Sequence, residues 1–224
     1  MSFLSRTMQE IRSPYVVACE DMGHAALVWE LLQHRGLMNC DVGCPSQEGD
    51  KITGITGIPH YLGRIRALIL SGKANLAGIM VVADADASAA TCFATICTAL
   101  QSGNFPAPSQ AFNVEGTAFR TAVFILPGAG RTGTLEHLLW DAAIEKTPKL
   151  QKCVAHFCRC TGGHINSAPE NKKAKMQISA LVASHCQKNP FASSGMIWHD
   201  KDNPIPIDSP CFKPLADFLT NFLT

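Results

Sequence analysis

The feature that most constrains this chain is an alternation of short apolar runs with segments whose apolar residues recur at helical spacing. This alternation is typical of a parallel sheet covered by helices. The predicted strands are 15–19, 79–83 and 121–126, with a further short strand near 41–42. The predicted helices have apolar stripes within 25–32, 62–69, 93–100 and 135–142. The sequence therefore predicts an α/β fold with a mostly parallel sheet flanked by helices and a helical C-terminal region.

We expect one domain spanning residues 1–224. A chain of 224 residues that is 46% hydrophobic can bury a substantial core. The core is expected within about 14–145, and a mostly helical extension within about 148–224. The ten cysteines are scattered, and several lie in apolar runs, so we expect reduced thiols and not a disulfide framework.

The overall charge and the hydropathy point to no particular class of partner. Nineteen basic and eighteen acidic residues give a net charge of +1, so the overall charge favours neither nucleic acid nor an anionic membrane. A nucleic acid would have to be held by a local patch. The N-terminus lacks the basic-then-apolar order of a secretory signal, and no apolar stretch has membrane-spanning length. A soluble cytoplasmic protein is the expectation.

Acidic residues directly follow two of the predicted strands. Glu20 follows the first, and the stretch GIMVVADADAS runs from an apolar strand into Asp84 and Asp86. Because the carboxyl ends of parallel strands form one edge of the sheet, these carboxylates converge if the two strands are neighbours. Side chains at i and i+2 of an extended segment point the same way, so Asp84 and Asp86 are expected to act together. Oxygen ligands at such spacing favour a hard cation, Mg²⁺ or Mn²⁺.

Other interpretations of these aspartates exist. An aspartate after a strand is often a helix cap or a turn residue. An isolated Asp-x-Asp pair also occurs in metal-binding glycosyltransferases and in phosphatases that use the first aspartate as nucleophile. The additional glutamate at the equivalent place of another strand–helix unit favours a functional site over capping alone.

With Glu20 after one strand and Ile79–Asp86 forming the next strand and its acidic turn, the chain resembles the Toprim fold, a Rossmann-like module. Toprim is the catalytic module of topoisomerases, bacterial primases and the OLD (overcoming lysogenization defect) nucleases. More narrowly, the chain resembles the small stand-alone Toprim-like proteins related to the OLD nucleases. The later stretch PGAGRTGTLEHLL, which contains Glu136, fits that subgroup.

The resemblance implies a site and a reaction. It assigns Glu20, Asp84, Asp86 and Glu136 as ligands of one or two Mg²⁺ or Mn²⁺ ions and as catalytic residues. Such ions bind the scissile phosphate, activate a water and neutralise the transition state. Glu20 could instead act as general acid or base. A lysine of Lys172, Lys173 and Lys175 matches the family's downstream basic residue; we assign Lys173 as catalytic, although which of the three lies nearest the site is left open.

The chain departs from the family pattern in its first motif. That motif usually reads Glu-Gly, with an acid or amide four residues after the glutamate. Here Asp21 replaces the glycine and His24 occupies the later position. The departure could weaken or retune one metal site.

Binding of a nucleic-acid backbone requires cations. Candidates are Lys51, Arg64, Arg66, Arg131, Lys172, Lys173 and Lys175. A solvated surface is the better interpretation for Arg64 and Arg66. Arg131, Lys172 and Lys175 are the preferred contacts, because they flank the predicted cleft.

Two further motifs invite chemical interpretations. The stretch HFCRCTGGH has the residue types of a zinc site in His156, Cys158, Cys160 and His164, but Cys-x-Cys with flanking histidines is less specific than paired Cys-x-x-Cys motifs, and packed thiols explain it better. The loop GAGRTG resembles a phosphate cradle, yet it lacks the lysine and hydroxyl residue that end a P-loop. A tight turn that positions Glu136 explains the loop equally well.

The sequence therefore favours a metal-dependent phosphodiester-cleaving nuclease in defence or nucleic-acid processing, with DNA preferred to RNA as substrate. One alternative is a catalytically weak effector that docks onto a separately encoded ATPase. The resemblance suggests such a partner because stand-alone Toprim proteins lack the ATPase that OLD nucleases carry in the same chain. Another is a phosphatase acting on small nucleotides. Homo-oligomerisation is left open.

Overall fold

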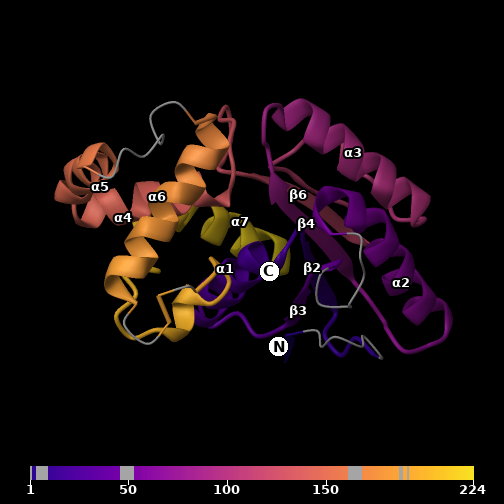
Figure 1. The fold of residues 1–224 in the computed structure, drawn as a ribbon. Coiled ribbons are helices and arrows are strands. Elements are labelled where there is room, and N and C mark those ends of the chain that lie inside the picture. The colour runs from indigo at the N-terminus through magenta and orange to yellow at the C-terminus, as the bar shows by residue number, and fades with distance from the viewer. Residues whose placement is uncertain (1, 4–9, 46–52, 161–167, 187–188, 191) are drawn as a thin grey trace.

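A computed structural model describes residues 2–3, 10–45, 53–160, 168–186, 189–190 and 192–224. At its centre lies a six-stranded sheet (Figure 1). In spatial order the strands are β1 (Ser2–Phe3), β3 (Cys40–Gly43), β2 (Tyr15–Cys19), β4 (Gly78–Asp84), β6 (Arg120–Leu126) and β5 (Val114–Glu115). All neighbouring pairs are parallel except β5 with β6. The predicted α/β class and mostly parallel sheet are confirmed.

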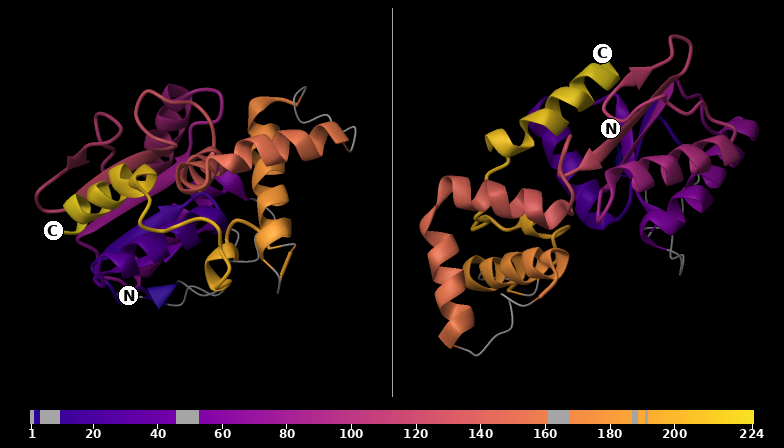
Figure 2. Two further views of the ribbon diagram at one scale, coloured as in Figure 1. Left: turned by 90° about the vertical axis from the view of Figure 1, so that its left-hand side faces the viewer. Right: turned by 90° about the horizontal axis from the view of Figure 1, so that it is seen from above.

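Helices cover both faces of the sheet, as Figures 1 and 2 show. The α-helices are α1 (Met22–His34), α2 (Ile58–Leu70), α3 (Ala89–Ser102), α4 (Leu135–Lys146), α5 (Lys149–Cys160), α6 (Glu170–His185) and α7 (Lys213–Leu223). Short 3-10 helices occupy Gly54–Gly57, Ile197–His199 and Pro210–Phe212. Helices α2 and α3 pack on one face, and α1 and α7 pack on the other. The molecule is thus a three-layer α/β/α sandwich.

The strands form because their residues are buried on both faces. Val16 and Val81 belong to the core shared with α2 and α3, while Val17 and Val82 belong to the opposite core. Burial of both alternating sets explains why these strands read as continuous apolar runs. The strand lengths predicted from those runs agree with β2, β4 and β6 to within one residue at either end.

Capping residues fix where the helices begin. Asp21 caps α1 by accepting hydrogen bonds from the backbone N–H groups of Gly23 and His24. Ser88 caps α3 by accepting one from Thr91 N at 3.2 Å. Each cap directly follows a strand or its short turn, so each helix starts at the carboxyl edge of the sheet.

The C-terminal region differs from the expected helical extension in one respect. Helices α4, α5 and α6 lie beside the sandwich (Figure 2), but α7 returns to the sheet. Phe222 is fully buried and meets Tyr15 of β2 edge to face, and Phe218 contacts Phe124 of β6. Arg120 also donates a hydrogen bond to the Phe222 carbonyl oxygen at 3.0 Å. Helix α7 is therefore, together with α1, part of a helical layer that covers one face of the sheet.

Several lesser expectations can be compared with the described residues. The cysteines whose side chains are described are free thiols. His156 and Cys160 are neighbours at 3.3 Å on α5, but His164 and the side chain of Cys158 lie outside the described residues, as does Lys51. Within the described part of the chain, no helix combines the length and apolar character needed to cross a membrane.

Candidate metal centre at the carboxyl edge of the sheet

The site begins with the pairing of β2 and β4. These strands are adjacent and parallel, with Cys19 opposite Val82, so the residues that follow them also meet. Glu20 N donates to the Val82 carbonyl oxygen at 2.9 Å, and Asp84 N donates to Glu20 Oε2 at 2.9 Å. The predicted convergence of Glu20 and Asp84 is confirmed.

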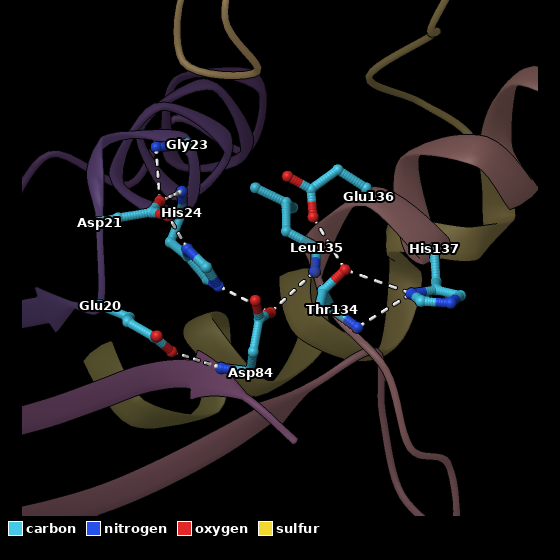
Figure 3. Close-up of polar contacts among 9 residues, drawn as sticks. All are labelled: Glu20, Asp21, Gly23, His24, Asp84, Thr134, Leu135, Glu136 and His137. Carbon is cyan, nitrogen blue, oxygen red and sulfur yellow. Dashed lines mark hydrogen bonds and ion pairs between the residues drawn. The ribbon is translucent and has the colours of Figure 1, made fainter. Parts of the chain in front are cut away.

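Helix α1 adds a histidine to this pair. Because His24 lies in the first turn of α1, its ring points back toward the end of β4 (Figure 3). The ring is 1% exposed, with Nε2 2.9 Å from Asp84 Oδ1 and Nδ1 2.7 Å from Asp21 Oδ1. The imidazole thus lies between two carboxylates that come from different elements.

Helix α4 also contacts Asp84. The backbone N–H of Leu135, the first residue of α4, donates to Asp84 Oδ1 at 2.7 Å. The first N–H groups of a helix have no partner within the helix and carry partial positive charge. Asp84 therefore satisfies one of them and also accepts from His24, so its side chain joins α1, β4 and α4.

The charges at the site are set by burial and by these contacts. Burial raises the pKa of Glu20, and the hydrogen bond from Asp84 N and the attraction of His24 offset only part of that rise. Burial alone would lower the pKa of His24, but Asp84 and Asp21 raise it well above its ordinary value. The two carboxylates therefore favour the protonated form of the His24 ring.

Asp21 shows the complementary effect. Burial opposes ionisation, yet the hydrogen bonds and the attraction of His24 outweigh it and lower the pKa of Asp21 to about 2. Its carboxylate is about half exposed, whereas the His24 ring is buried. Asp21 is thus an ionised anchor on the solvent side of the ring.

The arrangement can hold a metal ion. Ligand atoms of Glu20, His24 and Asp84 all lie within 4.8 Å of one another, the one such group of three among the described residues. Two carboxylates and one imidazole are ligands suited to a divalent cation. The donor set therefore fits the divalent cation that the sequence predicted, with a nitrogen ligand in addition to the oxygens.

Asp86 does not join this group. Strand β4 ends at Asp84, and Asp86 has a φ of +46°. The expectation that the backbone is extended through both aspartates is therefore wrong. Asp86 instead pairs through its backbone with Gly133, each N–H donating to the other residue's carbonyl oxygen at 2.8 and 2.9 Å. Its side chain is exposed, while that of Asp84 is mostly buried.

Glu136 lies on the first turn of α4, near the group but not within it. Its Oε2 accepts a hydrogen bond from the Thr134 hydroxyl at 2.8 Å, and Figure 3 shows the carboxylate on the far side of Leu135 from Asp84. His137 takes the position in α4 that His24 takes in α1, but its Nδ1 accepts from Thr134 N at 3.0 Å.

Two hollows adjoin the carboxylates, and Asp86 and Ala87 line both. One, of about 350 Å³, is lined by Ile55, Asp84, Ala85, Asp86, Ala87, Ser88, Thr91, Cys92 and Thr95. The other, of about 510 Å³, is lined by Asp86, Ala87, Thr132, Gly133, His137, Glu170 and Asn171. Exposed Asp86 therefore stands where the two spaces meet.

The predicted basic contacts lie around these hollows but line neither. Arg131 is paired with Asp141 at 2.5 Å, and Lys173 is paired with Glu170 at 3.3 Å. Lys172 and Lys175 are exposed on α6. Because Glu170 and Asn171 at the start of α6 line the larger hollow, this basic turn lies next to it.

The sequence did not predict that His24 joins Glu20 and Asp84 in the candidate metal centre. The sequence marked it only as a departure from a family pattern. A local signal does exist, since Asp21 and His24 have the spacing of a helix cap and the third residue of the helix, whose side chain commonly reaches back. That spacing predicts the Asp21 contact but not the contact with Asp84.

The fold and the site together define an α/β protein with a Rossmann-like sheet and a candidate metal centre at its carboxyl edge. The chain belongs to the family described as "Protein of unknown function (DUF3226)", which matches residues 14–224. No curated protein and no solved structure matches the chain.

Proposed function

We propose that this chain is a Toprim-like, divalent-metal-dependent enzyme that cleaves phosphodiester bonds in nucleic acid. The observation that carries the proposal is the meeting of Glu20, His24 and Asp84 within 4.8 Å at the ends of two adjacent parallel strands. Ligands of open α/β sheets bind at this edge. The resemblance of the surrounding motifs to Toprim nucleases supports the same reaction.

Each residue has a distinct task under this proposal. Glu20 and Asp84 would hold the cation, which supplies charge neutralisation and an activated water when bound. Glu20 is also the best candidate for proton transfer, because burial raises its pKa above the ordinary value of a glutamate. Asp86 is exposed beside both hollows, where it can hold a second cation against an incoming phosphate group.

The hollows and the basic turn suggest how a polymer would approach. A phosphodiester backbone needs cations within reach, and exposed Lys172 and Lys175 lie one and four residues beyond Asn171, which lines the larger hollow. Arg131 would have to exchange its partner Asp141 for a phosphate. DNA is the first substrate to test, with RNA as the alternative.

The experiment is a cleavage assay on labelled single- and double-stranded DNA and RNA with Mg²⁺ or Mn²⁺, using Glu20→Gln as the inactive variant. A glutamine carbonyl oxygen can still accept the hydrogen bond from Asp84 N, so the fold is kept while the charge is lost. Asp217→Asn, on the exposed surface of α7, is the matched control. Metal-dependent cleavage that the control retains and Glu20→Gln loses supports the proposal; equal cleavage by both variants contradicts it.

One observation favours a second candidate, a catalytically weak module that docks onto a partner such as a separately encoded ATPase. The buried His24 ring already pairs with Asp84 without a metal, and the neighbouring carboxylates favour its protonated form. A protein that neither cleaves nor binds divalent cations, yet co-purifies with a partner, would support this alternative. Including mononucleotides in the same assay tests the small-nucleotide phosphatase, which would turn them over and leave polymers intact.

A further inference from the structure

We infer that His24 is a metal ligand through Nε2, that Asp21 is the residue that positions it, and that the centre therefore selects a first-row transition cation such as Mn²⁺ over Mg²⁺. This inference rests on the proposed metal site and names the class of cation that the site takes. On this inference, His24 at the position where Toprim proteins usually carry an acid or amide changes the metal preference of the site.

The two ring nitrogens of His24 have separate surroundings. Nε2 lies 2.9 Å from Asp84 Oδ1, and both residues belong to the group whose ligand atoms lie within 4.8 Å of one another. Nδ1 faces Asp21, which is outside that group. A ligating histidine almost always donates its other ring N–H to a carboxylate, carbonyl or water, which fixes the tautomer and the ring orientation. Asp21 is in the position that this arrangement requires.

The Asp21 carboxylate is itself held in place. Oδ1 accepts backbone hydrogen bonds from Gly23 at 2.8 Å and His24 at 3.1 Å, in addition to the ring contact at 2.7 Å. The turn is also tightly packed, since a Cβ on Gly23 would lie 2.6 Å from Ser194 Oγ and 2.9 Å from Leu135 Cδ2. The ring therefore has little freedom to turn away from the carboxylates.

The donor set determines which cation fits. Mg²⁺ requires near-ideal octahedral oxygen coordination and loses its waters reluctantly. An imidazole beside two carboxylates suits first-row transition cations better, and affinity rises along that series. A cation at this position replaces the proton between His24 Nε2 and Asp84, and that proton passes to solvent.

The test is pulsed EPR of Mn²⁺ added to the full chain, read as coupling of the electron spin to ligand nitrogen. We expect nitrogen coupling in the wild type, which changes to the ¹⁵N pattern when the protein is made with ¹⁵N-histidine. This labelling needs no variant, so it decides the matter even if substitutions impair folding. Bound Mn²⁺ without histidine coupling would overturn the inference and leave the proposed function standing.

Variants then identify the histidine and its anchor. His24→Gln should abolish the coupling, whereas His137→Gln, at the same position of α4, should retain it. Asp21→Asn should weaken Mn²⁺ binding about tenfold to a hundredfold. The preference for Mn²⁺ over Mg²⁺, measured by calorimetric competition, should fall in His24→Gln. Coupling that survives His24→Gln would contradict the inference, and a wild type that binds no divalent cation would contradict both proposals.

Discussion

Asp84 is expected to stabilise the fold as well as to bind metal, and its replacement by alanine tests this. The side chain is 11% exposed and accepts hydrogen bonds from His24 Nε2 and Leu135 N. Hydrogen bonds to charged groups contribute about 1.5–3 kcal/mol each. Relief of the repulsion between Asp84 and Glu20 offsets part of the loss. We therefore expect Asp84→Ala to lower the free energy of unfolding by about 2–4 kcal/mol.

Asp84→Asn should cost less than alanine, because its amide oxygen can still accept from Leu135 N. In a chain of this size, about 2–4 kcal/mol corresponds to a fall in Tm of roughly 4–16 °C. The measurement is urea unfolding in excess chelator, so that metal binding does not contribute. Chelation also separates this structural role from any loss of a metal ligand.

Asp86→Asn is the matched control for this prediction. Asp86 is exposed, and asparagine tolerates its positive φ. Its stability should stay within about 0.5 kcal/mol of the wild type. If Asp84→Ala were as stable as Asp86→Asn, the contacts of Asp84 with α1 and α4 would contribute no net stability, and the reasoning would be refuted.

Three further predictions concern the rest of the molecule. In chelator, the stability that His24 contributes is complete below pH 6.5 and is lost as the pH rises through its raised pKa. The stability that Asp21 contributes is present above pH 3.8 and is lost as the pH falls toward its pKa of about 2. The urea midpoint of His24→Gln should therefore lack the decline that the wild type shows at alkaline pH. Gly116→Ala should lower Tm, because Gly116 has a φ of +93° and an added Cβ would overlap the Phe119 carbonyl oxygen. Gly63→Ala should not lower Tm, because a Cβ added there would meet no atom within 4 Å outside the nearby backbone of its own helix. Phe222→Ala should cost about 3–5 kcal/mol in urea unfolding if α7 belongs to the core; near-wild-type stability would make α7 an appendage.

Much of the fold could be predicted from the sequence because its strands are buried on both faces. Continuous apolar runs mark such strands, and the residue that ends each run marks the edge of the sheet. This is why Glu20 and Asp84 could be expected to meet. The short strands β1 and β5 escaped prediction, since two residues carry no periodicity.

The remaining features depend on contacts between distant segments. The apolar stripe of α7 is visible in the sequence, but the face that it covers is decided by the order of the strands. His24 meets Asp84 only because β2 and β4 are neighbours and α1 starts immediately after β2. The local spacing could predict that His24 Nδ1 meets Asp21. The contact of His24 Nε2 with Asp84 could be predicted only from the order of the strands in the assembled sheet.

The two aspartates of the opening motif have different tasks because of one backbone bridge. Asp86 leaves the extended conformation to pair with Gly133, and this pairing draws the start of α4 against the end of β4. Leu135 N can then reach Asp84, whose second contact is the ring of His24. The first aspartate is therefore buried among the groups that neutralise it, and the second is left facing the hollows. Although the two aspartates have the spacing of paired ligands, Asp84 is the candidate ligand and Asp86 is an exposed carboxylate beside the hollows. The third position of the ligand group beside Glu20 and Asp84 is therefore taken by His24.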